Sequence, residues 1–395
     1  MNMKSIYLIL LLSIFHSLKT KSQNSFDLEF YSYSGREHNI FKAPDVLFSL
    51  DENMYFNKDS FIVNSFFGEL GYDTRFRSKE KNKYSFEAGS ELWTRRYLSF
   101  SRANQLQWDA YLSFTKNIGG KIILESEYSF AYKDKLGSSI SGDELLRSFK
   151  YRSHEGIVGV LLDFSKMKSN PQLSYGYNNY FSDTTQMPLT HVNLGFDFEN
   201  EYKLNNKNII QLDFDLKQRN YLKYPASDSL GVTLNPQTLP GDMNTQATQL
   251  RKYRYSTIEA KYEFRPVRGV MVASGLSLFK RKDLYQGYYS YDGYSPELSL
   301  RYSRKKWYVY FYSDYRSVQY QKRLAFTYGN SADPLKYQYL DFKLKAKYQL
   351  TKYLEFYGNF LVDNRRSNTE LDYKITRRPY RNYEFLFGLN YMIFD

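Results

Sequence analysis

The segment LDFKLKAKY at residues 340–348 alternates apolar and charged residues over its whole length. In an extended strand its apolar residues, from Leu340 to Tyr348, share one face, and its charged residues, from Asp341 to Lys347, share the other. Such a strand has one face in an apolar medium and one face in water. Its length also matches that of a tilted strand that crosses a bilayer, which is about 9–11 residues.

The same alternation recurs along the chain, for example at residues 84–94 and 106–114. In most of these segments the apolar face is longer than the five or six residues that are typical of strands in soluble sheets. We therefore expect strands near residues 25–35, 61–76, 83–95, 105–115, 121–133, 151–164, 171–181, 190–203, 208–221, 253–264, 269–280, 296–303, 306–320, 336–348, 353–363 and 382–394.

The connections between these segments alternate in length. Short polar turns, such as RSKEKN at 77–82 and RPVR at 265–268, separate longer links, such as 134–150 and 222–252. This asymmetry is typical of outer-membrane barrels. The pattern predicts an all-β fold, namely a transmembrane antiparallel up-and-down β-barrel of about 16 strands with short periplasmic turns, longer extracellular loops and both termini on the periplasmic side. A soluble propeller or sandwich is the alternative fold class.

The beginning of the chain has the features of a secretory signal peptide. Lys4 supplies a positive charge, the stretch from Ile6 to Phe15 is apolar, and small residues precede a cleavage position after Ser22. The apolar stretch is too short for a transmembrane helix, which needs about 20 residues. We expect residues 1–22 to be the signal peptide and residues 23–395 to form one outer-membrane β-barrel.

Composition narrows the possible classes of protein. The chain has no cysteine, which excludes zinc–thiolate sites, iron–sulfur sites, disulfides and a lipid-anchored cysteine. The mean hydropathy of −0.62 and the lack of a long apolar run after the signal exclude a helical membrane protein. Aromatic residues make up 19% of the chain, and tyrosine dominates among them. Tyrosine suits a lipid–water boundary because its ring is apolar and its hydroxyl is polar.

The net charge of +13 does not make nucleic acid the expected partner, because many of the bases lie in predicted turns. Positions that we assign to the inner face are instead rich in acids. If the barrel encloses a pore, these charges predict a weak preference for cations. The alternative is that they pair with one another and fill the interior. The candidate lumen-facing charges are Glu87, Glu91, Asp109, Glu125, Glu127, Asp213, Asp215, Glu259, Lys343 and Lys345.

A second basic set recurs beside tyrosine at the loop-side ends of the predicted strands. Guanidinium groups at this depth would bind lipopolysaccharide phosphates or an acidic polysaccharide. The alternative is interfacial anchoring, with tyrosine in the aromatic girdle and arginine reaching the water. The candidate loop-side contacts with an anionic ligand are Arg95, Arg96, Arg219, Arg316, Arg365 and Arg366.

The last predicted strand, 382–394, resembles the C-terminal insertion signal of bacterial outer-membrane proteins, although the chain ends in Asp395 where that signal has phenylalanine. This resemblance implies the barrel-insertion machinery as a partner. The stretch GREHNIFKAPD at 35–45 and the triplet Arg95-Arg96-Tyr97 resemble parts of barrels associated with exopolysaccharide export or surface assembly. The chain as a whole resembles outer-membrane barrels of the Bacteroidota kind.

No catalytic, metal-binding or cofactor-binding motif is recognised, and there is no nucleotide-binding loop or zinc-protease signature. Ser153-His154 and Thr190-His191 are adjacent pairs, so on a strand their side chains point to opposite faces and form no nucleophile–base dyad. We therefore expect no enzyme activity, no metal and no cofactor.

Three functions agree with this pattern. The first expectation is a channel for the diffusion or transport of small polar solutes, because a barrel of about 16 strands has room for an aqueous lumen. The alternatives are a barrel for export or surface assembly of polysaccharide and a non-conducting scaffold for envelope proteins. Residues 222–252 would form either an inward constriction or an outer binding loop. The expected location is the cell outer membrane, in contact with its lipid and lipopolysaccharide.

Overall fold

The computed structural model describes residues 25–40, 47–49, 54–56, 63–78, 83–137, 147–148, 150–181, 189–227, 249–325, 333–368 and 379–394. The expected signal peptide lies outside the described residues, as does most of the link at 222–252.

Sixteen strands form one closed antiparallel barrel. They are β1 (Ser25–His38), β4 (Ser65–Arg77), β5 (Tyr84–Tyr97), β6 (Gln105–Gly119), β7 (Ile122–Asp134), β10 (Tyr151–Asp163), β11 (Met167–Tyr180), β12 (His191–Asn205), β13 (Asn208–Pro225), β14 (Leu250–Phe264), β15 (Val270–Asp283), β16 (Tyr291–Arg304), β17 (Trp307–Leu324), β18 (Pro334–Gln349), β19 (Leu354–Ser367) and β20 (Tyr380–Phe394). Separate from the barrel sheet are the pairs β2 (Leu47–Ser49) with β3 (Met54–Phe56) and β8 (Leu136–Gly137) with β9 (Arg147–Ser148), and the 3-10 turn η2 (Ser101–Ala103).

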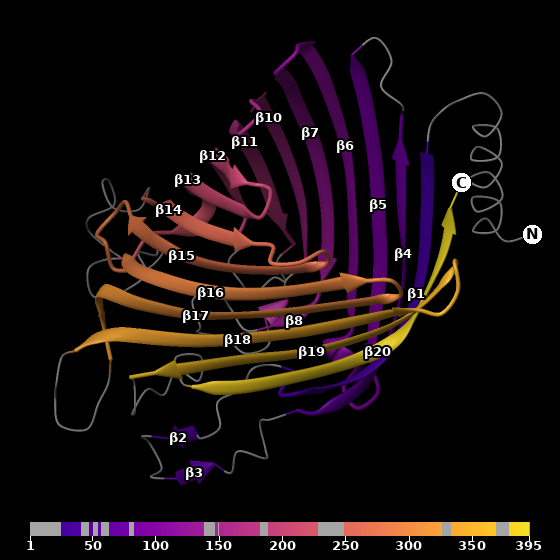
Figure 1. Ribbon diagram of the computed structural model, residues 1–395. Helices are drawn as coiled ribbons and strands as arrows, with labels where there is room; N and C mark the ends of the chain where they lie inside the picture. The colour runs from indigo at the N-terminus through magenta and orange to yellow at the C-terminus, as the bar shows by residue number, and fades with distance from the viewer. Residues whose placement is uncertain are drawn as a thin grey trace, which may run out of the picture.

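Each barrel strand pairs with the barrel strands before and after it in the chain, and β20 pairs with β1 to close the sheet (Figure 1). The closing ladder runs from Asp27 opposite Phe394 to His38 opposite Tyr383. Closure gives every barrel strand a partner on both sides, so the barrel has no free edge to present to lipid. Among the described residues, no helix has the length and apolar character needed to cross a membrane.

The two ends of the barrel differ in the length of their connections. At one end, which we call the short-turn rim, β12 joins β13 through residues 206–207 and β16 joins β17 through residues 305–306. At the other end, the loop rim, β1 and β4 are separated by residues 39–64, and β13 and β14 by residues 226–249. The even number of strands places the first and the last strand end at the short-turn rim, as expected from the sequence.

All sixteen predicted strands are confirmed, and the differences lie at their ends. At the short-turn rim β6 continues to Gly119 and β11 begins at Met167, each four residues beyond the prediction. At the loop rim β13 continues to Pro225, β17 continues to Leu324 and β16 begins at Tyr291, so each extends four or five residues further at that end than predicted. At Gln321 and Lys322 both faces of the extended β17 carry polar side chains. The alternation of hydrophobicity that marks a strand is lost where both faces meet water, although the backbone ladder continues.

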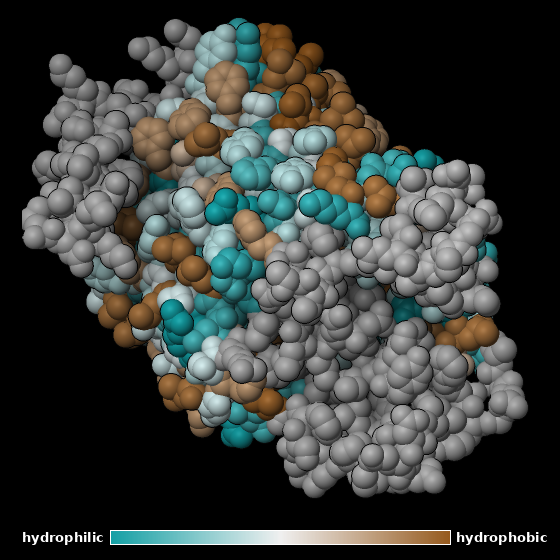
Figure 2. Space-filling view, turned by 180° about the vertical axis from the view of Figure 1, so that it is seen from behind, coloured by the Kyte–Doolittle hydropathy of each residue, from teal (hydrophilic) through white to brown (hydrophobic). Residues whose placement is uncertain are grey.

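The outer face of the barrel carries large apolar side chains. Ile258, Leu278 and Tyr294 stand side by side in register on β14, β15 and β16, with 57%, 54% and 45% of their surfaces exposed. Figure 2 shows apolar side chains gathered along the upper right edge of that view and mixed with polar side chains nearer its middle. A continuous exposed apolar surface is stable only against an apolar medium or partner.

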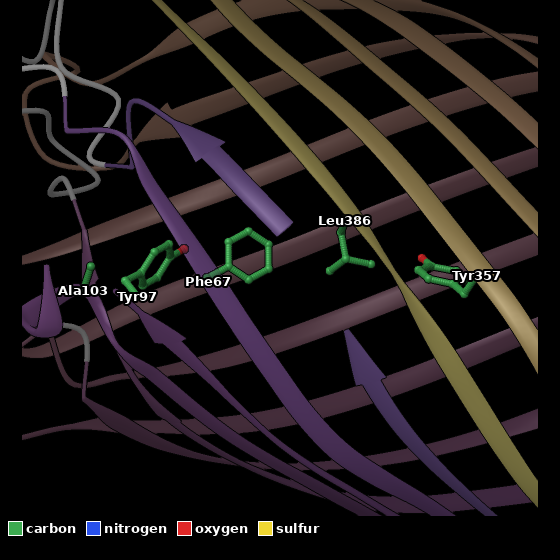
Figure 3. Packing of buried hydrophobic residues seen from close by; sticks show 5 residues of the cluster. All are labelled: Phe67, Tyr97, Ala103, Tyr357 and Leu386. Carbon is green, nitrogen blue, oxygen red and sulfur yellow. The ribbon is translucent and has the colours of Figure 1, made fainter. Parts of the chain in front are cut away.

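The inner face holds the buried aromatic residues in separate clusters instead of one central core. One cluster lies beside the closing ladder and contains Phe67, Tyr97, Ala103, Tyr357 and Leu386 (Figure 3). The Tyr33 and Tyr357 rings lie 4.8 Å apart although β20 runs between their strands. Gly388 of β20 is opposite both tyrosines in register, so the two rings meet across a position without a side chain.

A side chain at position 388 is expected to weaken this closure. A Cβ atom at Gly388 would lie 2.0 Å from the Ser32 carbonyl oxygen and 2.5 Å from the Tyr33 ring, whereas a Cβ at Gly358 meets nothing within 4 Å. Gly388→Val should lower the free energy of unfolding by about 1–3 kcal/mol, and Gly358→Val should leave it nearly unchanged. Urea unfolding in detergent micelles measures both; equal stability of the two variants would contradict the close packing at Gly388.

Candidate functional site

The inner wall is identified by side chains that meet across intervening strands. Tyr31 of β1 donates a hydrogen bond to Glu91 of β5 at 2.9 Å, although β4 lies between the two strands. Such contacts are possible only on the concave face of the barrel. All ten charges that the sequence analysis assigned to the lumen alternate with the exposed apolar residues and lie on this inner face; they are Glu87, Glu91, Asp109, Glu125, Glu127, Asp213, Asp215, Glu259, Lys343 and Lys345.

Five carboxylates form a belt across the inner faces of three neighbouring strands. Asp197 of β12 is directly opposite Asp215 of β13, and Glu199 of β12 is opposite Asp213 of β13. Asp213 is in turn opposite Glu259 of β14. Like charges in direct cross-strand register repel one another, so this acidic belt attracts cations from the surrounding water.

Bases lie on a different part of the inner wall. Lys345 and Lys347 of β18 lie over the Tyr357 ring, with their amines 5.3 Å and 5.9 Å from its centre. Lys347 also forms a 2.7 Å ion pair with Glu355 of β19. Lysines also occur beside the acids, since Lys261 of β14 pairs with Glu297 of β16 at 2.6 Å, so the inner wall carries both signs of charge.

A hollow of about 540 Å³ opens on the inner faces of β14 to β18. We call it the lumenal hollow. A volume of this size falls in the range of about 300–1,000 Å³ that is typical of small-molecule sites. Six tyrosines contribute to its lining, namely Tyr255, Tyr291, Tyr312, Tyr320, Tyr337 and Tyr339.

Polar groups of the lumenal hollow are held by neighbouring strands. Tyr312 donates to Glu297 at 3.1 Å, and Ser277 donates to Glu259 at 3.0 Å. Ser295 donates to Asp314 at 3.1 Å. Because these carboxylates are oriented by side chains from the adjacent strand, the hollow presents fixed acceptor groups beside flat aromatic faces.

A row of arginines and tyrosines continues from the hollow towards the loop rim. The Arg281 guanidinium lies 4.3 Å from the Tyr291 ring centre and donates to the Tyr289 carbonyl at 2.9 Å. Arg251 and Arg323 also lie over tyrosine rings, at distances of 4.2 Å and 4.7 Å. These arginines are nearly fully buried, and their stacking on aromatic faces offsets part of the cost of desolvating the charge.

The six arginines predicted to contact an anionic ligand do not form one surface. Arg219 and Arg365 face inward and lie over the Tyr255 and Tyr337 rings. Arg316 also faces inward, but it lies within β17 beside Asp314 and Asp341, both at 3.7 Å, and not at a strand end. Arg96 and Arg366 alternate to the outer face and are exposed.

Arg95, which the sequence suggested as a contact for an anionic ligand, is paired with carboxylates of the barrel itself. Its guanidinium contacts Glu69 at 2.8 Å, Glu384 at 2.7 Å and Glu37 at 3.5 Å. Glu37 also accepts a 2.5 Å hydrogen bond from Tyr97. These groups come from β1, β4, β5 and β20. The ion pairs of Arg95 therefore connect β20 with β1, β4 and β5, across the ladder that closes the barrel.

The two serine or threonine–histidine pairs are split between the faces, as predicted. His154 lies on the outer face, where its Nδ1 is 2.7 Å from the Tyr128 hydroxyl. His191 is buried, with its Nδ1 2.7 Å from the Leu189 carbonyl. Within the part of the chain that the structure describes, no three histidine, aspartate or glutamate side chains are grouped so as to hold a metal ion.

Sequence reasoning missed Arg251, Arg281 and Arg323 as members of the inner wall. The signal was present, since Arg251 alternates with Tyr253 and Tyr255, and Arg281 follows Phe279 by two positions. These residues lie near strand ends, where we interpreted basic side chains as parts of loops.

These features define a closed sixteen-strand antiparallel β-barrel with an apolar outer face and a polar, aromatic inner wall. No protein-family model matches the chain, and no curated protein matches it in sequence. Among solved structures, OccAB3 of Acinetobacter baumannii aligns with 94% of this chain and 100% of its own, at 10% identity and a TM-score of 0.49.

Two further solved structures show a similar degree of likeness. The outer membrane protein OprD from Pseudomonas aeruginosa aligns with 95% of this chain and 96% of its own, at 9% identity and a TM-score of 0.47. The copper transporter OprC aligns with 94% of this chain and 82% of its own, at 10% identity and a TM-score of 0.46. Likeness at this level does not extend the activity of any of these proteins to this chain.

Removal of the Arg95 guanidinium should strongly destabilise the barrel. In Arg95→Ala three nearly buried carboxylates lose their common partner, which is expected to cost about 3–5 kcal/mol. Arg96→Ala, at the exposed neighbouring position, serves as the matched control and should cost little. Tryptophan fluorescence monitors the urea unfolding of both variants in micelles. If Arg95→Ala unfolded at the same urea concentration as the parental protein, the structural role of the cluster would be refuted.

Proposed function

We propose that the chain is an exported outer-membrane channel for small polar solutes, with the loop rim on the extracellular side and the short-turn rim in the periplasm. The observation that carries the proposal is the lumenal hollow, which is large, polar and aromatic and lies on the inner wall of a sixteen-strand barrel. Barrels of 16–18 strands generally leave an aqueous lumen. The apolar outer face supports a location in a membrane.

The lining of the hollow favours neutral, polyhydroxylated solutes such as oligosaccharides. Flat rings, including Tyr291 and Tyr312, offer apolar faces to the C–H surface of a sugar ring. Glu259, Glu297 and Asp314 accept hydrogen bonds from hydroxyl groups and are already oriented by the adjacent strands. Binding at such a site is transient because solute and site remain hydrated, which suits passage through a channel.

A sugar should therefore interrupt the ion current. Maltotriose added to a planar bilayer that contains the reconstituted protein should reduce conductance, and Tyr291→Ala should weaken this block about 3- to 10-fold through the loss of roughly 1 kcal/mol of ring contact. Tyr294→Ala, on the outer face of the same strand, is the matched control. Absence of any conductance would reject the channel, whereas an unaltered block in Tyr291→Ala would reject only the binding site.

The acidic belt should make the current weakly cation-selective. In a salt gradient the reversal potential of the parental protein should have the sign expected for a channel that prefers cations. In the double variant with Asp213→Asn and Glu199→Gln the reversal potential should move towards zero, because two carboxylates of the belt are neutralised. Asp292→Asn removes an exposed carboxylate from the outer face and should leave the reversal potential unchanged. Clear anion selectivity of the parental protein would contradict this expectation.

A second candidate function is passage or surface assembly of a polysaccharide. The specific observation in its favour is the pair of inward arginines Arg316 and Arg365, which are accessible and lie over the Tyr339 and Tyr337 rings beside the hollow, because cations next to rings suit an acidic polymer. Liposome swelling separates the two functions. Faster swelling with neutral sugars supports the solute channel, and a preference for acidic oligosaccharides supports the polymer function.

A further inference from the structure

Four bases stand close together on the outer face of β14 and β15, near the loop rim. They are Lys252 and Arg254 on β14 and Lys280 and Lys282 on β15, and all four are exposed. They alternate with inward residues in the same phase as Ile258 and Leu278 of the apolar outer face. We call these four residues the outer basic patch.

The register of the sheet brings these bases into positions that are unfavourable in isolation. Arg254 is directly opposite Lys282, and Lys280 is the next outward residue on β15. Directly opposite side chains have Cβ atoms about 4.5–5.5 Å apart, and like charges in that position destabilise a sheet. Among the described residues, the ion pair recorded for the patch joins Lys280 to Asp292 at 3.4 Å. Four bases against one acid leave a net charge of +3.

The same strands prevent the bases from turning away from the outer surface. The inward neighbours Arg251, Tyr253 and Arg281 are buried among other rings and fill the space on the other side of the sheet. Outward bases also occur near the loop rim of β18 to β20, at Lys336, Arg366 and Arg381, but their partners in register are Gln319, Gln338 and Asn364 and not other bases. At the same end of β6 and β7 the outward residues include Leu106, Tyr132 and Asp134 and carry no comparable cluster of bases.

The patch lies immediately beyond the apolar surface formed by Ile258, Leu278 and Tyr294. In a barrel that spans a membrane, the end of the apolar outer surface marks the depth at which the headgroups of a lipid leaflet begin. An anionic group at that depth would accept charge-assisted hydrogen bonds from the lysines and a bidentate pair from Arg254. It would also neutralise the repulsion between Arg254 and Lys282.

We propose that the outer basic patch binds the phosphate groups of a lipid headgroup in the leaflet that surrounds the loop rim, and that this headgroup carries more than one phosphate. The acyl chains of the lipid lie against the apolar residues below the patch. The inference requires that the barrel spans a membrane, which is part of the proposed function, but it does not require that the lumen conducts. Conductance measurements therefore test the channel independently.

The test uses the full barrel in neutral detergent micelles, titrated with fluorescent diphosphorylated lipid A. The variant combines Lys252→Gln, Arg254→Gln, Lys280→Gln and Lys282→Gln, and should bind the lipid at least 10-fold more weakly than the parental protein. A matched control with Lys166→Gln, Lys207→Gln, Arg268→Gln and Lys305→Gln changes the net charge equally at the short-turn rim and should bind as the parental protein does. Lipid A without phosphates should bind neither protein well.

The heat-dependent gel shift of folded barrels shows whether each variant folds. If the fourfold variant does not fold, Lys282→Glu alone provides the comparison and should also weaken binding, because it replaces a cation of the patch by an anion. Parental affinity of the folded patch variant would overturn the proposal. If the short-turn control lost affinity for lipid A to the same extent, binding would depend on net charge alone. If inorganic phosphate at equal concentration displaced lipid A, the patch would bind a free anion. Either result would reject a lipid site.

Discussion

The absence of water from the hydrocarbon interior of a membrane is the constraint on which this structure depends. Each backbone N–H and C=O group at that depth needs a partner within the protein, and an antiparallel sheet meets this need only when its first and last strands pair. Here the closing ladder of β1 and β20 satisfies that requirement. The packing of Tyr33 and Tyr357 across Gly388 and the carboxylates around Arg95 reinforce the same seam from the inside.

Closure also divides the chemistry of the chain between two faces. Because successive residues of a strand alternate, a residue that moves by one position exchanges lipid for lumen. Register then gathers similar side chains from neighbouring strands, as in the carboxylates of β12–β14 on the inside and the bases of β14–β15 on the outside. The functional surfaces of this barrel are therefore patches spread over several strands, and no single sequence motif contains one of them.

The assembly of these surfaces from several strands explains which features can be predicted well from the sequence. Alternation over segments such as 340–348 is a local property, so the strands, the even strand number and the facing of residues such as Glu87 and Lys345 follow from it directly. The ends of strands such as β13 and β17 cannot be predicted from alternation, because the backbone hydrogen bonds continue where both faces of the strand are in water. The surroundings of Arg95 depend on which strands are neighbours after closure, since Glu384 is 289 residues away along the chain. The lumenal hollow likewise depends on the relative heights of five strands, which alternation alone does not determine.

The two rims also differ in how much change they tolerate. Residues 206–207 and 305–306 reverse the chain without slack, so an inserted segment there would separate strands that must remain hydrogen-bonded. The longer connections also join neighbouring strands, whose ends are hydrogen-bonded at Ile40 and Val63 and at Ala226 and Gln249. Because these connections already contain many residues, extra residues add only a small entropy cost to their closure. The surface at the loop rim can therefore be remodelled by insertions and deletions while the short-turn rim stays a compact ring of turns.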